Sequence, residues 1–257
     1  MTDPSPRLRP AADLLPGEHT PSLAGRHPQR LLDLIPSPRQ DFDNFVTGDN
    51  AELVGRLRAG LPAAGAERFL YLWGVHGSGC THLLRAAAGA AGERGRYMDL
   101  ADPDGPIGIE LLAGAHGAEH LCVALDHVET IDAAGEQRLF NLCNTLRQER
   151  PQCMLIVAGS RPPGALGLRA DLVTRLSWGL TYEVRALTEA QKAAAMAAHA
   201  AARGMSVGGE VHDWLLQTMP RDMHSLLAAL DALDRYSLAA KRAVTLPLAR
   251  EWLRSLA

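Results

Sequence analysis

The stretch YLWGVHGSGCTHLL (residues 71–84) decides the fold of this 257-residue chain. It begins with the apolar residues of a buried strand, passes through a glycine-rich loop, and ends in the first turns of a helix. Gly74 and Gly79 have the spacing of the pattern GxxxxGK[ST], and Gly77 adds flexibility between them. Glycines in such a loop let backbone N–H groups turn inward around a phosphate, and the N-terminus of the following helix points at the same anion. The stretch therefore predicts a strand, a phosphate-binding loop and a helix.

Position 80 departs from the pattern, because Cys80 stands where such a loop carries its lysine. Thr81 follows at the position whose hydroxyl binds Mg²⁺. A thiol with an ordinary pKa of about 8.5 is neutral near neutral pH and cannot replace an ammonium group on the phosphates. The loop alone leaves two interpretations open: a nucleotide site that has lost a charge, or a glycine-rich turn without a ligand.

Strands and helices alternate around this loop. Five short runs bounded by turn signals predict strands at 68–74, 94–100, 120–126, 153–160 and 180–187. The run at 120–126 is continuously apolar, as expected of a strand that is buried on both faces of a sheet. Helical patterns separate the runs, so the sequence predicts an α/β core with a mostly parallel sheet and helices on both sides.

The pattern changes to helices alone in the last part of the chain. TEAQ (188–191) is a capping box, in which Thr188 caps the helix and Gln191 bonds back to it. Three more helical patterns follow. The longest carries an apolar stripe, formed by Met223, Leu226, Leu227, Leu230 and Leu233.

Composition and pattern together divide the chain into three parts. Residues 1–37 predict a disordered tail, in which residues 1–28 are rich in proline, serine, arginine and acidic residues and a short leucine cluster follows. Residues 38–187 predict the α/β core, and residues 188–257 predict a small helical domain.

The bulk composition is that of a soluble globular protein, with 47% hydrophobic and 21% charged residues. The net charge of −3 lacks the basic excess of a protein coated by nucleic acid. The four cysteines are far apart and form no CxxC pair, which argues against a zinc site and favours reduced thiols in a cytoplasm. No apolar run approaches the ~18 residues of a membrane span. The first ten residues, MTDPSPRLRP, have no apolar region of a signal peptide.

The end of the third predicted strand supplies a second candidate for the site. Asp126 closes the apolar run LCVALD, where a nucleotide hydrolase has a carboxylate that holds Mg²⁺ through its water shell. Such hydrolases usually carry a second acid directly afterwards to orient water, but this chain has His127 there. Glu129 is expected to point elsewhere if the strand continues. An acidic strand end without a ligand is the alternative for Asp126.

Two arginines are further candidates. Arg175, in ADLVTRLSWGL, lies at the end of a predicted helix near a domain edge, where an arginine can reach into the γ-phosphate site of a neighbouring molecule. Arg221, in MPRDMHSLL, begins a helix of the small domain and can fold back on the phosphates of a bound nucleotide. Taken singly, each is also compatible with an ordinary solvated arginine.

Together these features resemble the AAA+ module of the bacterial replication initiator DnaA, over residues ~38–257. The loop, the Asp126 strand, the two arginines and the segments FDNFVTGDNAEL (42–53) and AGSRPP (158–163) carry the resemblance. It implies an AAA+ P-loop sheet with flanking helices and a C-terminal helical lid. It also implies Mg²⁺ at Thr81 and Asp126. The nucleotide-binding residues that it implies are Phe45, Val46, Gly74, Gly77, Gly79, Cys80, Thr81, His82, Asp126 and Arg221.

The chain ends where DnaA continues into its DNA-binding helix-turn-helix domain. With SRPP, LSWG and a C-terminal TLPLAREWL, it is similar to the DnaA-homologous regulator family Hda. The resemblance implies an inhibitor of DNA replication, bound to the DNA polymerase III sliding clamp (its β subunit), which stimulates hydrolysis of the ATP held by DnaA. Arg175 would then act in trans, the chain's own site would hold ADP, and the chain would not be an ATPase by itself. A homo-oligomer is left open, and contact with DNA is expected to be indirect or weak.

The tail carries the segment that would bind the clamp. QRLLDL resembles the clamp-binding hexapeptide of the family, with Gln29, Leu32 and Leu34 at matching positions. Arg30 departs from it, since a leucine is usual there. A shifted register, LLDLI (31–35), would lose the glutamine. Packing of these leucines on the body of the protein is the structural alternative.

Three functions follow from these expectations. The first is a clamp-bound regulator that presents Arg175 to DnaA-bound ATP. The second is an autonomous ATPase of the helicase-loader type, which needs the phosphate charge clamp that Cys80 does not supply. The third is an adaptor between clamp and initiator with an empty nucleotide site.

Overall fold

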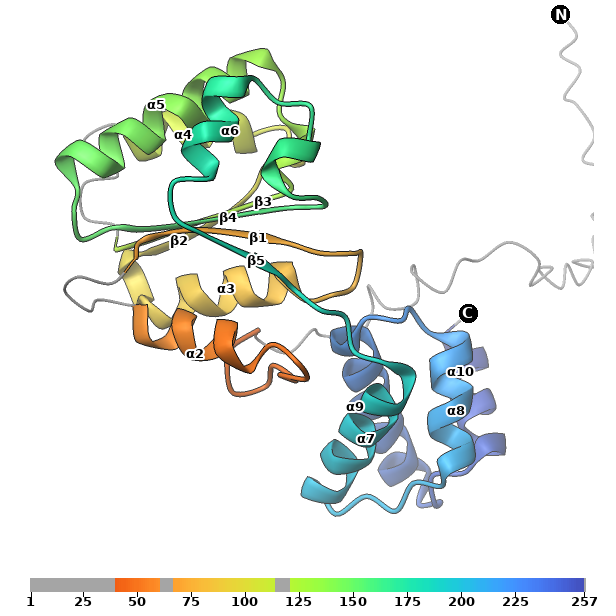
Figure 1. Cartoon of the computed structure of the whole chain (residues 1–257). Helices are drawn as coiled ribbons and strands as arrows, with labels where there is room; N and C mark the ends of the chain where they lie inside the picture. The colour runs from red at the N-terminus through yellow and green to blue at the C-terminus, as the bar shows by residue number, and fades with distance from the viewer. Residues whose placement is uncertain (1–39, 61–66, 114–120, 257) are drawn as a thin grey trace, which may run out of the picture.

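The computed structural model describes residues 40–60, 67–113 and 121–256. Five parallel strands form one sheet in the order β2-β3-β4-β1-β5 (Figure 1). Their bounds are β1 Phe69–Trp73, β2 Gly95–Asp99, β3 Cys122–Asp126, β4 Met154–Gly159 and β5 Leu180–Glu183. The parallel α/β sheet predicted from the alternating pattern is confirmed. The tail residues Gln29, Leu32 and Leu34 lie outside the described residues.

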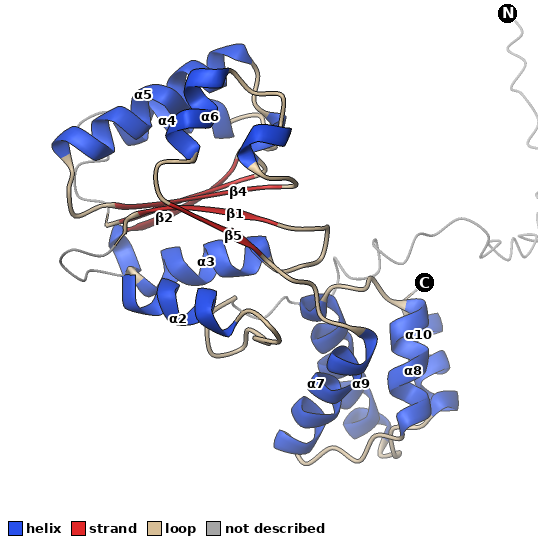
Figure 2. Cartoon of the chain, viewed as in Figure 1, coloured by secondary structure: helices blue, strands red, loops and turns tan. Residues whose placement is uncertain are grey.

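Helices cover both faces of the sheet, as Figures 1 and 2 show. One layer holds α2 (Ala51–Gly60) and α3 (Cys80–Ala90), and the other holds α4 (Gly105–Ala113), α5 (Ala133–Glu149) and α6 (Ala170–Leu176). Alternation along β1 serves both layers, because successive side chains of a strand point to opposite faces. Tyr71 belongs to the core cluster of α4, α5 and α6, whereas Leu70 and Leu72 belong to that of α2 and α3.

The strand order brings the functional ends of three strands together. β4 lies between β3 and β1, so the loop after β1, the acid at the end of β3 and Ser160 after β4 share one edge of the sheet. Ligands of parallel α/β sheets bind at such carboxyl edges. Beneath this edge the Tyr71 hydroxyl donates to the Arg161 carbonyl oxygen at 2.8 Å, which fixes the chain just beyond β4.

The C-terminal part of the described chain is a helical domain of α7 (Glu189–Ala202), α8 (Gly209–Thr218), α9 (Met223–Ala240) and α10 (Leu246–Ser255). The capping box predicted at the start of α7 is present: the Gln191 backbone N–H donates to the Thr188 hydroxyl oxygen at 3.2 Å, and the Thr188 backbone N–H donates to the Gln191 side-chain oxygen at 2.9 Å. In the α9 stripe, Leu226, Leu230 and Leu233 are fully buried. The other two members, Met223 and Leu227, are partly buried and face the cavity described below.

Two elements differ from expectation. The strand expected to run to residue 187 ends at Glu183, because the chain leaves the sheet after the Val184 N–H bonds the Trp73 carbonyl oxygen at 2.7 Å. Helix α4 has no counterpart in the predicted pattern, and its sequence GPIGIELLA contains two glycines and a proline. Within the described residues no helix combines the length and the apolar character that crossing a membrane requires.

Candidate nucleotide-binding site

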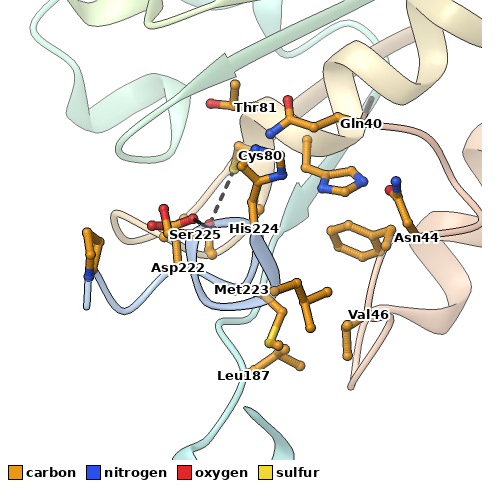
Figure 3. Close-up of a pocket in the computed structure, with 18 of the residues that line it drawn as sticks. Gln40, Asn44, Val46, Cys80, Thr81, Leu187, Asp222, Met223, His224 and Ser225 are labelled. Carbon is orange, nitrogen blue, oxygen red and sulfur yellow. Dashed lines mark hydrogen bonds between the residues drawn. The ribbon is translucent and has the colours of Figure 1, made fainter. Parts of the chain in front are cut away.

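A cavity of about 1430 Å³ lies between the carboxyl edge of the sheet and the helical domain. Figure 3 shows that three separate parts of the chain surround it: the segment with Asn44 and Val46, the loop end with Cys80 and Thr81, and the start of α9 with Met223 and His224. Nine residues implied by the DnaA resemblance line it, namely Phe45, Val46, Gly74, Gly77, Gly79, Cys80, Thr81, His82 and Asp126.

The glycine loop has a conformation that requires glycine. Gly77 has φ 80° and Gly79 has φ 107°, values that side chains disfavour. A Cβ on Gly79 would lie 2.8 Å from the Phe45 ring, and one on Gly74 would lie 2.6 Å from the Val184 carbonyl oxygen. Gly79 is also the N-cap of α3 and has no side chain to bond the first N–H groups of the helix. Those N–H groups therefore suit an anion.

Cys80 begins α3 and supplies no charge to the loop. Its Sγ atom lies 3.5 Å from the Ser78 hydroxyl oxygen. Burial, against the smaller effect of this contact, raises the pKa of the Cys80 thiol to about 11. The thiol is therefore neutral at physiological pH, as expected from the sequence, and less reactive than an exposed cysteine.

Asp126 lies in the cavity wall and is only 2% exposed to solvent. One carboxylate oxygen accepts the His127 N–H at 3.0 Å, and the other accepts the Tyr97 hydroxyl at 3.1 Å. Each oxygen keeps a lone pair for a water. Within the described residues no group of three His, Cys, Asp or Glu side chains could hold a metal by itself. Thr81 and Asp126 therefore suit Mg²⁺ that arrives with phosphate oxygens and its own waters.

Glu129 lines the cavity, whereas it was expected to point elsewhere if the strand continued. That expectation assumed a continuing strand, but β3 ends at Asp126 and His127 adopts a left-handed backbone with φ 53°. The short 3₁₀ turn η3 (Val128–Thr130) then carries Glu129 back, where its carboxylate accepts the Ser160 N–H at 3.3 Å. A left-handed histidine is uncommon, and the sequence gives no clear signal for it.

The segment before α2 is fixed against the loop. Phe45 contacts the ring of His82 edge-on, with ring centres 5.1 Å apart. His82 Nε2 lies 2.8 Å from the Asp41 carbonyl oxygen and donates to it. This contact explains why segments about forty residues apart in sequence form one wall of the cavity.

The helical domain contributes an acid to the phosphate loop. Arg221 is exposed in the turn before α9 and is not among the cavity-lining side chains of the described chain. The next residue, Asp222, caps α9 by accepting the Ser225 N–H at 2.8 Å, and it lies beside Gly77. In this conformation the loop therefore faces a carboxylate rather than a guanidinium.

Sequence patterns missed the charged residues that α7 and α9 direct to the cavity. Asp231 bonds His199 at 2.6 Å and Arg203 at 3.1 Å, and Lys192 pairs with Glu189 at 3.3 Å. His199 lies on α7 and Arg203 is the C-cap residue just after it, 32 and 28 positions before Asp231, so no local motif reveals the cluster. The helical spacing of Lys192, His199 and Arg203 along one face was the available signal.

Arg175 lies outside this cavity. It is in the last turn of α6, and its guanidinium carbon stacks over the rings of Trp178, at 4.1 Å, and Phe140, at 4.9 Å. It is partly exposed. The structure thus separates this arginine from the chain's own phosphate loop.

The histidines at the cavity predict that acid destabilises the protein. Burial lowers the pKa values of His82 and His224 below the ordinary 6.5. The unfolded chain therefore takes up protons first, so stability that is present above pH 6.5 is lost as pH falls through the folded pKa values.

His127 has the opposite effect on the pH dependence of stability. Burial lowers its pKa, but the hydrogen bond to Asp99 and nearby carboxylates outweigh burial and raise it. Its stabilisation is complete below pH 6.5 and is lost as pH rises through the folded pKa.

We expect His82→Gln, which retains a donor for Asp41, to lose less stability than the wild type between about pH 8 and pH 5.5. Urea unfolding at each pH measures this. The exposed His76→Gln variant is the control and should follow the wild type. Parallel curves for wild type and His82→Gln would contradict the assignment.

The fold and the loop together define the class. The chain is similar to domain III of the replication initiation protein DnaA of Thermotoga maritima, with a TM-score of 0.62, 19% identity and coverage of 85% of this chain and 97% of that one. It is similar to AMPPCP-bound DnaA of Aquifex aeolicus, with a TM-score of 0.62, 23% identity and coverage of 77% and 65%. A variant of Thermotoga maritima RuvB gives a TM-score of 0.61, 13% identity and coverage of 85% and 72%. The chain therefore has the fold of these proteins, an α/β core followed by a small helical domain.

The lid narrows this class further. Residues 189–253 match the family model described as "Hda, lid domain". The helical domain thus matches the lid domain of Hda, and it follows a core with the fold of DnaA domain III.

Proposed function

We propose that this protein is a negative regulator of replication initiation that acts on DnaA. Bound to the sliding clamp in the cytoplasm, it stimulates hydrolysis of DnaA-bound ATP and leaves the initiator in its inactive ADP form. The observation that carries the proposal is that the phosphate loop lacks its cation while an arginine side chain is available elsewhere on the protein. The chain's own phosphate loop has a neutral Cys80 in place of its cation, while the guanidinium of Arg175 stands outside that site.

Arg175 would supply in trans a positive charge that offsets the negative charge on the γ-phosphate oxygens in the transition state. The chemistry takes place in the partner's site. An Hda-type lid and a DnaA-type core support this assignment, because AAA+ modules of one fold can associate through equivalent faces.

We propose that the chain's own site holds ADP. The inward N–H groups of the loop and the N-terminus of α3 suit a diphosphate, and Thr81 and Asp126 suit an accompanying Mg²⁺. A γ-phosphate would meet no lysine at position 80 and would lie near the carboxylates of Asp126 and Glu129. The lid cations Lys192 and Arg203 are already paired with acids. Electrostatics therefore favour ADP over ATP.

The competing functions make different demands on the same site. An autonomous ATPase would turn over ATP without the initiator, and an adaptor with an empty site would release no nucleotide on denaturation. Glu129 at the cavity favours the ATPase more than the sequence did, since it places an acid near Ser160. Cys80 still leaves that acid without the phosphate clamp.

The tether is tested together with the function. ATP-bound initiator is mixed with DNA-loaded clamp and this protein, and the ADP formed is measured over time. We expect stimulation by the wild type and at least a ~10-fold weaker effect of Leu32→Ala/Leu34→Ala at the same concentration, because the docking leucines are removed.

The matched control is Leu14→Ala/Leu15→Ala, a leucine pair elsewhere in the same tail. It should stimulate like the wild type. Undiminished stimulation by the Leu32 and Leu34 variant would remove the tether from the proposal, and no stimulation by the wild type would refute the proposal itself.

A further inference from the structure

The side chain of Arg175 is held by aromatic rings. Its guanidinium carbon lies 4.1 Å from the centre of the Trp178 ring and 4.9 Å from that of Phe140. Trp178 follows α6 in the turn to β5, and Phe140 lies on α5. Cation–π contacts of this kind hold an arginine in place through its flat face.

The hydrogen-bond donors of Arg175 are left unused. Its Nε is buried without a partner, and the guanidinium forms no ion pair or hydrogen bond with any of the described residues. Arg169, just before the same helix, shows the usual alternative, with bonds to Asp171 at 2.6 Å and Gln137 at 2.8 Å. A buried donor without an acceptor is unfavourable, so it calls for an explanation in a native structure.

The indole ring is itself well anchored. Trp178 meets Phe69 of β1 edge-on, with ring centres 6.1 Å apart and an interplanar angle of 86°. Arg147, in the last turn of α5, also lies 4.1 Å from the centre of the Trp178 ring. Both guanidinium groups are thus well within a Debye length of ~10 Å, and their combined charge attracts an anion more strongly than one of them would.

We infer that Trp178 is a positioning residue for Arg175. With Phe140 it orients the guanidinium through ring faces alone, which keeps Nε buried and leaves the terminal NH2 groups of the partly exposed side chain free for the phosphate oxygens of a partner-bound nucleotide. A carboxylate in the same place would fix the side chain but occupy those donors and cancel the charge. This inference rests on the proposed function, and it adds the residue that prepares Arg175 for it.

Stimulation measured against protein concentration tests the inference. We expect Trp178→Leu to lower the maximal stimulated rate about tenfold or more, since small displacements of a catalytic group are costly. The concentration for half-maximal stimulation should change less than about twofold, because the docking surface remains. Trp178→Phe keeps a ring face and should recover most of the rate.

Trp214→Leu, on the lid helix α8, is the matched control and should keep the wild-type rate. A wild-type maximal rate in Trp178→Leu would overturn the inference. So would a loss that appears only in the half-maximal concentration, or equal losses in the Leu and Phe variants.

A second measurement needs no initiator. The Nε–H proton NMR signal of Arg175, identified by its absence in Arg175→Lys, should be shifted upfield by the rings and exchange slowly with water. In Trp178→Leu we expect exchange to be at least ~10-fold faster, because the buried position is lost. An unchanged exchange rate in Trp178→Leu would overturn this inference and leave the proposed function standing. A wild-type protein that fails to stimulate hydrolysis would instead contradict the proposed function.

Discussion

Replacing Arg175 by alanine is expected to reduce the stimulated hydrolysis of initiator-bound ATP by about 10³-fold or more, the usual contribution of an arginine supplied in trans. The loss follows from the transition state, in which charge spreads over the γ-phosphate oxygens and a forked cation neutralises it. Arg175→Lys should recover only part of the rate, because an ammonium lacks the planar fork. The measurement is ADP formed from ATP-bound initiator with loaded clamp.

A control from the same helix region makes this result specific. Arg169→Ala removes an exposed arginine that is already paired with Asp171 and Gln137, so it should leave stimulation close to the wild-type rate. If Arg175→Ala stimulated as the wild type does, the trans mechanism would be wrong. Stability measured by urea unfolding shows whether either variant is folded.

Replacing Cys80 by lysine is expected to tighten ATP binding about 10- to 100-fold, because a charge-assisted hydrogen bond to phosphate contributes roughly 1.5–3 kcal/mol. Calorimetric titration measures the affinity. The nucleotide released from denatured protein should change from ADP in the wild type to a mixture rich in ATP in the variant. Asp126 and Glu129 lie near enough to the thiol to influence its pKa, so a new ammonium there meets favourable charge.

Cys80→Ala is the matched control for this variant. It removes the thiol without adding charge and should bind nucleotide as the wild type does. Unchanged ATP affinity in Cys80→Lys would show that the missing cation does not limit the site. Release of ATP, or of no nucleotide, from the wild type would contradict the ADP assignment.

The parts of the fold that follow local rules could be predicted. Each of the five strands lies within a run predicted to be a strand, and the capping box at Thr188 forms the two bonds that its spacing implies. The phosphate loop was predictable because its glycines serve backbone conformations that few residues adopt. Asp126 followed from its place at the end of a buried strand.

The parts that depend on tertiary contacts could not be predicted. Glu129 reaches the cavity only because His127 takes a left-handed conformation, stabilised by contact with Asp99 at 2.7 Å, from a different strand. Helix α4 forms despite its glycines and proline, because Ile109 and Leu112 are buried against the sheet. The aromatic contacts of Arg175 likewise involve a ring 35 positions away on another helix.

The packing around the glycine loop determines which of its positions can be substituted without disturbing the fold. Gly74 and Gly79 are confined by the Val184 carbonyl and the Phe45 ring, so substitution there would disturb the fold whether or not a nucleotide is used. Position 80 accepts a small neutral side chain beside Ser78 without strain on its backbone. A substitution at position 80 is therefore expected to disturb the fold less than one at Gly74 or Gly79. The glycines of this loop therefore indicate the fold, whereas the residue at position 80 indicates which phosphate chemistry the loop can support.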